Sequence, residues 1–234
     1  MFKDAIGDRM KQYENCYRIY LPRRSAVVVR IDCRAFHTFT KGFARPYDKL
    51  FASCMWETAR KLCENVSGCK IGFTQSDEIT LILTDYENLN TEPWFGNNLQ
   101  KIVSITASMA TLFFNNAFRE AVKTTKIGLT EDLKMHTRAL NERTAVFDSR
   151  AFLIPREEIF NVLYWRQLDT KRNSIQLLGQ ANFSHKELQN KNSDEIQEML
   201  FQEKGINWAK EPEWFKNGVA IYKKPTEVMF LNHN

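Results

Sequence analysis

The chain has 234 residues and a net charge of +5, from 33 basic and 28 acidic side chains. Apolar residues make up 43% of it and mean hydropathy is −0.45, which excludes a largely disordered chain and is ordinary for a globular protein. The five cysteines include no C-x-x-C pair, which argues against a disulfide framework or a structural zinc site. No apolar run reaches membrane-spanning length and no signal peptide is evident, so we expect a cytoplasmic protein.

The first half of the chain predicts most of a split βαββαβ unit. Residues 25–31 carry the β-branched run AVVV, which is typical of a buried strand. Apolar residues recur about every four positions from 50 to 66 and predict an amphipathic helix. Residues 70–74 and 79–84 predict a β-hairpin. A long, largely buried helix is expected over 97–118, with Asn97 or Asn98 near its N-cap, and a further strand over 145–147.

The second half is less regular. Residues 120–143 are charge-dense without clear periodicity, which predicts a loop or mobile insertion. Helical patterns cover 155–168 and 193–201, and strands are expected at 219–222 and 228–231. The expected fold is therefore α+β, an antiparallel sheet with helices on one face and a helical C-terminal extension. Residues 1–150 and 151–234 form its two parts, packed together as a single compact unit.

Carboxylates stand at two places where strands end. Asp32 follows the first strand, and Asp77 and Glu78 lie at the tip of the hairpin. The first strand of such a sheet commonly pairs beside this hairpin, so the carboxylates can converge. Converging carboxylates repel one another unless a cation neutralises them, and Mg²⁺ prefers such oxygen ligands. Spacing alone nevertheless favours a plainer interpretation, in which Asp32 caps a turn and the hairpin tip is simply polar.

The residues around these carboxylates change that balance. The stretch RIDCRAFHTF at 30–39 resembles the RIDGRxFHxF signature of tRNA(His) guanylyltransferases and guanylyltransferase-like 3′-to-5′ polymerases, and QSDE at 75–78 matches their second signature. Similar matches follow in family order: FARPYD at 43–48, FDSR at 147–150, WRQLD at 165–169 and GINW at 205–208. Ordered matches across about residues 25–220 are far more specific than any one motif.

The resemblance implies a polymerase-palm-like catalytic domain over residues 1–150, with an RNA-contacting extension over 151–234. Such enzymes add nucleotides to the 5′ end of a tRNA. The 3′-hydroxyl of an incoming nucleoside triphosphate attacks a 5′ end that ATP or GTP has activated. The implied cofactor is Mg²⁺, as two ions that act together in nucleotidyl transfer. ATP, GTP and other nucleoside triphosphates are the implied substrates, and a homo-tetramer is the implied assembly.

The resemblance also assigns roles to residues. Asp32, Asp77 and Glu78 are the implied catalytic residues. Asp32, Asp77 and the backbone carbonyl of Cys33 would hold the metal, with Glu78 as a support or occasional ligand. The implied nucleotide-binding residues are Cys33, Arg34, Ala35, Phe36, His37, Arg45, Asp48, Ser76 and Lys101. The implied RNA-binding residues are Lys171, Arg172, Asn173, His185, Lys186 and Lys191.

Two departures from the family pattern bear on function. Cys33 replaces a glycine, at a cost of about 1 kcal/mol if the backbone there is left-handed. Residues 169–176 keep little beyond Asn173 of a HINNLYN stretch associated with adding the extra guanosine of tRNA(His). We therefore expect templated repair of 5′-truncated tRNA. The alternatives are guanosine addition to tRNA(His), a non-catalytic RNA-binding protein and, less favoured, nucleotide cyclisation.

Several single residues keep a second interpretation. Ser76 either contacts the nucleotide or bonds its own turn. His37 either touches a phosphate or packs structurally, and His185 either contacts RNA or lies in a surface N-cap region. Asp148 and Arg150 either support the site or form a simple salt bridge.

Overall fold

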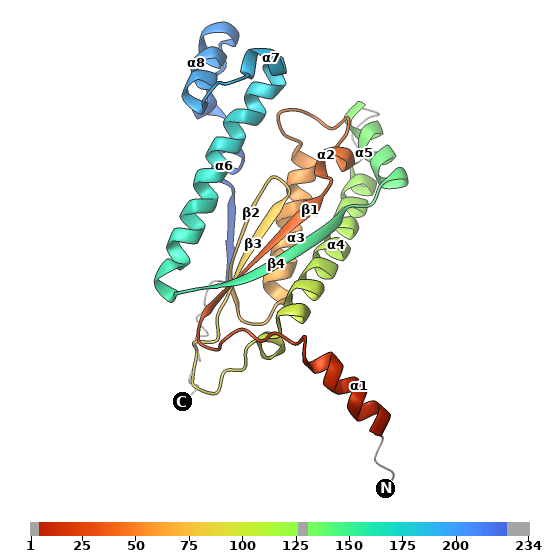
Figure 1. Ribbon diagram of the computed structural model, residues 1–234. Coiled ribbons are helices and arrows are strands. Elements are labelled where there is room, and N and C mark those ends of the chain that lie inside the picture. The colour runs from red at the N-terminus through yellow and green to blue at the C-terminus, as the bar shows by residue number, and fades with distance from the viewer. Residues whose placement is uncertain (1–4, 126–130, 224–234) are drawn as a thin grey trace, which may run out of the picture.

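The computed structural model describes residues 5–125 and 131–223. Its centre is an antiparallel sheet with the strand order β4-β1-β3-β2-β5 (Figure 1). The strands are β1 (Ala26–Arg34), β2 (Cys69–Gln75), β3 (Glu78–Leu83), β4 (Val146–Ile154) and β5 (Val219–Tyr222). The first four follow the predicted βαββαβ order, and the α+β class is confirmed.

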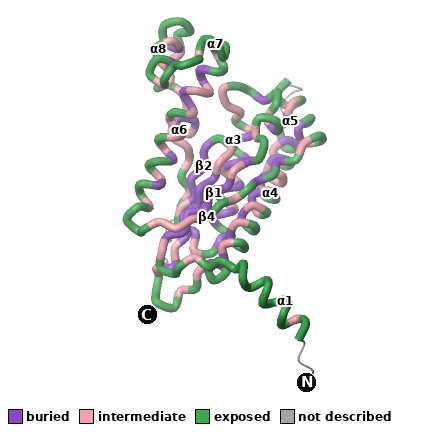
Figure 2. The backbone as a smooth tube through the Cα atoms, in the orientation of Figure 1, coloured by how far each residue is buried: buried purple, intermediate pink, exposed green. Residues whose placement is uncertain are grey.

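One face of the sheet is covered by α3 (Lys49–Asn65) and α4 (Leu99–Thr124) (Figure 1). Alternate residues of β1, including Val27, Val29 and Ile31, pack against these helices in the main core, as the period of two in a strand requires. Figure 2 shows the buried residues concentrated in the sheet and on the inner sides of α3 and α4.

The opposite face of the sheet carries the extension. Val28 and Ile82 pack there against Val162 of α6 (Ile159–Asn182). Further elements are α7 (His185–Leu188), α8 (Ser193–Lys204), α9 (Glu213–Asn217) and short 3-10 helices at Trp94–Asn97, Arg156–Glu158 and Trp208–Lys210. Residue 150 falls inside β4, and β5 pairs with β2. Both parts of the chain therefore contribute strands to one sheet.

Helix ends follow local chemistry. The side chain of Asp48 caps α3 by accepting from the amide of Phe51, and Asn98 caps α4 in the same way, as predicted. The turn after α3 contains Gly68 at φ +76°, where a Cβ would lie 2.8 Å from the carbonyl oxygen of Thr84. Glycine is therefore required at this turn for both conformation and space.

Several elements differ from the prediction. The described parts of 120–143 are mostly helical and not the predicted loop, because α4 continues to Thr124 and α5 spans Glu131–Glu142, where His136 and Ala139 are buried behind a charged outer face. The helix predicted over 155–168 continues to Asn182, since Ile175 and Leu178 pack with α8. The predicted strand 145–147 is the start of the longer β4. Helices α1 (Ala5–Asn15) and α2 (Phe36–Phe39) were not predicted, and 228–231 lies outside the described residues.

The cysteines are all free, and Cys54 and Cys63 lie in the core as expected. Within residues 5–125 and 131–223, no helix has the length and apolar character needed to cross a membrane.

The cysteine that replaces the family glycine occupies ordinary strand backbone. Cys33 is 2% exposed in β1 and packs in the main core. The left-handed residue is Ala35, at φ 54° and ψ 41°. The condition for strain at residue 33, a left-handed backbone, is therefore not met there and is met at Ala35.

We predict opposite effects of glycine at these positions. Cys33→Gly should lower the free energy of unfolding by about 2 kcal/mol, because it removes a buried side chain from a strand. Ala35→Gly should raise it by about 1 kcal/mol, because glycine adopts the left-handed region freely. Urea unfolding of both variants tests this, and a Cys33→Gly protein more stable than Ala35→Gly would contradict the account.

Candidate functional site

Strand register brings the predicted carboxylates together. Asp32 on β1 lies directly opposite Glu78 on β3 and Asp148 on β4. The amide of Cys33 donates to the carbonyl oxygen of Asp77 at 3.2 Å, which ties the hairpin turn to the end of β1. The side chain of Asp32 belongs to the sheet face opposite α3 and α4, because its neighbours Ile31 and Cys33 both pack in the main core.

The crowding of these carboxylates affects their protonation. Burial raises the pKa of Asp32, and the charges of Glu78 and Asp148 raise it further. Burial, followed by the charge of Asp32, raises the pKa of Asp77 to about 7. Among the described residues no arginine, lysine or histidine forms an ion pair with either aspartate. A bound cation would stabilise both in their charged form.

The thiol of Cys33 takes no part in this cluster. Its side chain lies among the apolar residues between the sheet and the helices. Burial, followed by the charge of Asp77, raises the pKa of Cys33 to about 12, so the thiolate that would react or bind metal is suppressed. The backbone of residue 33 adjoins the aspartates, while its sulfur does not.

Glu78 is held by arginines. The Nε atom of Arg30 donates to one carboxylate oxygen at 2.7 Å, and Nη2 of Arg166 donates to the other at 2.8 Å. Nη1 of Arg166 donates to Asp169 at 2.6 Å. The indole ring of Trp165 stacks near both guanidinium groups, 5.2 Å from that of Arg30 and 4.6 Å from that of Arg166. Both oxygens of Glu78 are thus engaged within the protein, and its role as an occasional metal ligand stays a prediction.

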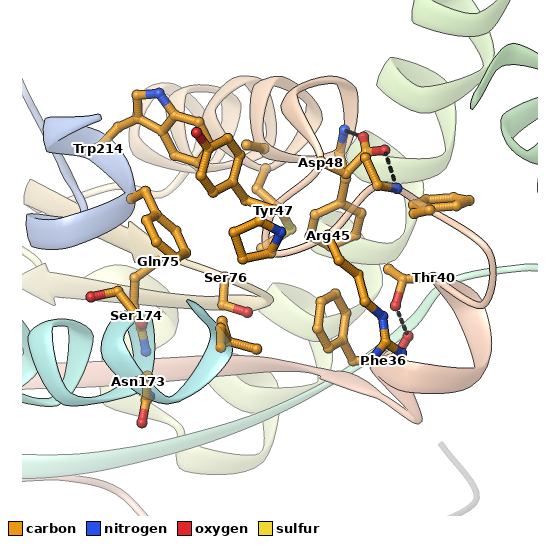
Figure 3. Close-up of a pocket in the computed structure, with 18 of the residues that line it drawn as sticks. Phe36, Thr40, Arg45, Tyr47, Asp48, Gln75, Ser76, Asn173, Ser174 and Trp214 are labelled. Atoms are coloured by element: carbon orange, nitrogen blue, oxygen red, sulfur yellow. Dashed lines mark hydrogen bonds between the residues drawn. The ribbon is translucent and has the colours of Figure 1, made fainter. Parts of the chain in front are cut away.

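A cavity of about 310 Å³ opens beside the hairpin tip (Figure 3). One wall is the segment around α2 and the following loop, and another is the α6 stretch with Thr170, Asn173 and Ser174. Trp214 and Phe215 close the side near α9. Of the predicted site residues, the cavity is lined by Phe36, His37, Arg45, Asp48, Ser76 and Asn173.

Asp48 has a structural task at this cavity. Besides capping α3, its carboxylate accepts from the amide of Ala44 at 3.3 Å and bonds Nε2 of His136 at 2.8 Å. Burial acts to raise the pKa of Asp48, but the hydrogen bonds from His136, Phe51 and Ala44 together hold it below its ordinary value. The carboxylate therefore joins the cavity loop to α3 and α5.

The other predicted nucleotide-binding residues lie in different parts of the structure, and not all of them are near the carboxylates. Arg34 and His37 are exposed at the end of β1 and on α2. Ser76 is exposed at the hairpin tip, in left-handed backbone at φ 48°. Lys101 is exposed on the first turn of α4, with Nζ 5.7 Å from the ring centre of Phe95. Since α4 covers the face opposite Asp32, this chain by itself does not bring Lys101 to the carboxylates.

The predicted RNA-binding residues form two groups. Lys171, Arg172 and Asn173 lie on α6 near the cavity, and Arg172 pairs with Asp169 at 2.6 Å. His185 lies on α7 in a groove that shares Arg45 and Gln180 with the cavity. Lys186 and Lys191 are exposed nearby. Ser184 caps α7 through a capping box, as expected of a surface helix start.

Asp148 and Arg150 form a long, exposed ion pair of 3.5 Å. The simple salt-bridge interpretation accounts for these two residues. Asp148 also adds negative charge beside Asp32.

The predicted set of site residues missed Arg166, Thr170, Trp214 and His136. Arg166 is part of the WRQLD match, which was the available signal. His136 lies in the charged segment whose helical pattern was not recognised. Trp214 carried no signal that distinguished a cavity wall from core.

We predict that the Asp48 carboxylate stabilises the protein in a pH-dependent way. Because its folded pKa is depressed, its contribution is present above its unfolded value of about 3.9 and is lost as pH falls through the folded value. Asp48→Asn, which keeps the N-cap, should lower the unfolding free energy by about 2 kcal/mol at neutral pH. The deficit should shrink below about pH 4. A deficit independent of pH in urea unfolding would contradict this.

Comparison with known proteins identifies the family of the chain. Residues 7–155 match the family model described as tRNAHis guanylyltransferase. A probable tRNA(His) guanylyltransferase of Dictyostelium discoideum is 32% identical over 214 residues, covering 86% of this chain and 76% of that protein.

Solved structures agree as well. A bacterial tRNA(His) guanylyltransferase-like protein in complex with ATP is 46% identical, with a TM-score of 0.84 over 94% of this chain and 89% of its own. One in complex with GTP is 42% identical, with a TM-score of 0.78 over 96% and 87% of the two chains. The chain belongs to the tRNA(His) guanylyltransferase family of nucleotidyltransferases.

Proposed function

We propose that this protein adds nucleotides to the 5′ end of tRNA by Mg²⁺-dependent nucleotidyl transfer, and that 5′-truncated tRNA is its preferred substrate. The observation that carries the proposal is the convergence of Asp32 and Asp77 at the end of β1, beside a cavity of about 310 Å³. That volume is in the range of small-molecule sites. Relatives described in complex with ATP and GTP support a nucleotide as its occupant.

The donor set fits Mg²⁺. No cluster of three or more His, Cys, Asp or Glu side chains in the described part of the chain is arranged to hold a metal. Mg²⁺ does not need one, because it commonly binds one or two carboxylates and completes its shell with water and phosphate oxygens. Asp32, Asp77 and the carbonyl of Cys33 would hold it. Bound there, Mg²⁺ would neutralise charge on the reacting phosphates.

The remaining residues of the site would bind and orient the substrates. Arg45 at the cavity places a guanidinium where it can pair with phosphate oxygens. Tyr47, Trp56 and Trp214 supply an aromatic end of the cavity that suits a nucleobase. The 3′-hydroxyl of that nucleotide would attack the phosphorus at the activated RNA 5′ end and form a phosphodiester bond. The bond to the activating group breaks, so AMP leaves an adenylylated end and pyrophosphate leaves a 5′-triphosphate.

The preference for repair rests on α6. Residues 169–176 differ from the stretch associated with guanosine addition, and Thr170, Asn173 and Ser174 from this stretch line the cavity. The hydroxyl of Ser174 is engaged, since it donates to the carbonyl of Lys171 and accepts from Nε1 of Trp208. The departure from the family stretch therefore lies in the cavity wall, where it can alter which RNA end and nucleotide are accepted.

The test is an incorporation assay with labelled nucleoside triphosphate, Mg²⁺ and 5′-truncated tRNA. Asp32→Asn and Asp77→Asn should each lower the rate by roughly three orders of magnitude, because a metal clamp supplies several kcal/mol to the transition state. Binding of the tRNA should persist. The control is Asp194→Asn, an exposed aspartate at the start of α8. Activity that survives in both site variants would refute the mechanism.

The same assay distinguishes the substrates. We expect faster incorporation into 5′-truncated tRNA than guanosine addition to intact tRNA(His). A clear preference for intact tRNA(His) would establish the guanosine-adding alternative. RNA binding that falls with salt, without any incorporation, would establish the non-catalytic one.

A further inference from the structure

The inward side of α6 carries a buried arginine between an apolar contact and the cavity. Val162, Arg166, Thr170 and Ser174 follow one another at intervals of four residues, so they form one stripe along the helix. Val162 packs on the sheet with Val28 and Ile82. Thr170 and Ser174 line the cavity. Arg166 therefore lies between the part of α6 that packs on the sheet and the part that lines the cavity.

The buried environment of Arg166 lowers the stability of the fold. Its side chain is 3% exposed, and its Nε atom is buried without a hydrogen-bond partner in the described structure. Burying a charge and leaving an N–H unsatisfied both oppose folding. Apolar residues of similar volume often replace a buried ion pair at no loss of stability. Stability therefore gives little reason for an arginine at this position.

The partner of Arg166 provides a reason. Glu78 follows Asp77 in the chain and lies opposite Asp32 across the sheet. Arg166 holds one oxygen of Glu78, while Arg30 on β1 holds the other. The ion pair thus connects the strands that carry the aspartates to the helix that forms the cavity wall.

We propose that Arg166 is a positioning residue: through Glu78 it fixes the α6 wall of the nucleotide cavity relative to Asp32 and Asp77. Glu78 serves as the anchor for Arg166 and is not a metal ligand. This proposal rests on the proposed function for its kinetic consequences, while its effect on nucleotide binding can be measured separately. The planar guanidinium bridges Glu78 and Asp169 with separate nitrogens, which a lysine ammonium cannot reproduce in the same geometry.

The experiment compares Arg166→Gln, Arg166→Lys, Glu78→Gln and the double variant Glu78→Gln/Arg166→Gln with wild type. Equilibrium binding of ATP with Mg²⁺, thermal unfolding, kcat, KM for ATP and the Mg²⁺ midpoint at saturating ATP are measured. Arg156→Gln is the matched control, because Arg156 also lies beside α6 but stacks on Tyr86 instead of reaching Glu78.

Both Arg166 variants should bind ATP about tenfold more weakly and show a comparably raised KM, since a misplaced wall weakens substrate positioning. Glu78→Gln should leave the Mg²⁺ midpoint within about twofold of wild type, because no ligand is lost. The double variant should lose less than the sum of the single variants, since residues in one ion pair are coupled. Arg156→Gln should behave as wild type in ATP binding.

Either of two results with the variants would overturn the proposal. One is ATP affinity and KM of folded Arg166→Lys and Arg166→Gln within about twofold of wild type. The other is a Glu78→Gln variant whose Mg²⁺ midpoint rises severalfold, which would make Glu78 a ligand. If Arg166→Gln fails to fold, Arg166→Lys supplies the same comparison. A wild-type chain that binds ATP without incorporating nucleotides refutes the proposed function but leaves the binding comparison intact, and one that binds no ATP overturns both.

Discussion

Carboxylates crowd one end of this sheet because the strand register leaves no alternative. Asp32 faces Glu78 on one neighbouring strand and Asp148 on the other, while the hairpin turn adds Asp77. Like charges directly opposite each other destabilise a sheet, so each has to be offset by a partner. The positions of several nearby charged side chains can be explained by this need to offset the repulsion between carboxylates.

Some of these carboxylates have an arginine beside them and others have none, and this difference defines the site. Arg30 and Arg166 engage Glu78, and Arg150 lies 3.5 Å from Asp148. Within the described residues the two aspartates at the end of β1 have no such partner. Burial is the largest cause that raises the pKa values of Asp32 and Asp77, and the charges of neighbouring carboxylates raise them further. Arginines thus offset the charges of Glu78 and Asp148, whereas a bound cation would stabilise Asp32 and Asp77 in their charged form.

The cavity is assembled from segments that lie far apart in the sequence. Its walls come from the loop before α3, the hairpin tip, the middle of α6 and the segment around α9. Tyr47 joins two of these segments, since its ring packs 5.0 Å from that of Trp214 and its hydroxyl bonds Glu211 at 3.1 Å. Asp48 and Arg166 supply the polar connections at either side. Correct folding of the extension is therefore a condition for completing the site.

Local patterns predicted most of the sheet, and the strand order also predicted that Asp32 converges with the hairpin carboxylates. Their assignment as metal ligands came from the family resemblance and stays a prediction. The run AVVV marked β1, and QSDE marked the hairpin whose turn carries Asp77. Prediction from the sequence failed where tertiary contacts decide: α5 is rich in charged residues while His136 and Ala139 are buried, and α6 continues to Asn182 because Ile175 and Leu178 pack with α8. The pairing of Arg166 with Glu78 could not be inferred, since it depends on how α6 crosses the sheet, whereas Arg30 lies on β1 two positions from the residue opposite Glu78. Cys33, in place of the family glycine, lies in strand backbone, and the left-handed position is Ala35.

The central claim is that Asp32 and Asp77, and not Glu78, hold the metal. Crystals grown with Mn²⁺ and ATP and measured at the manganese absorption edge test it directly. The account predicts anomalous density within about 2.3 Å of carboxylate oxygens of Asp32 and Asp77, with Glu78 still bonded to Arg30 and Arg166. Density coordinated by Glu78, or none at the end of β1, would contradict it.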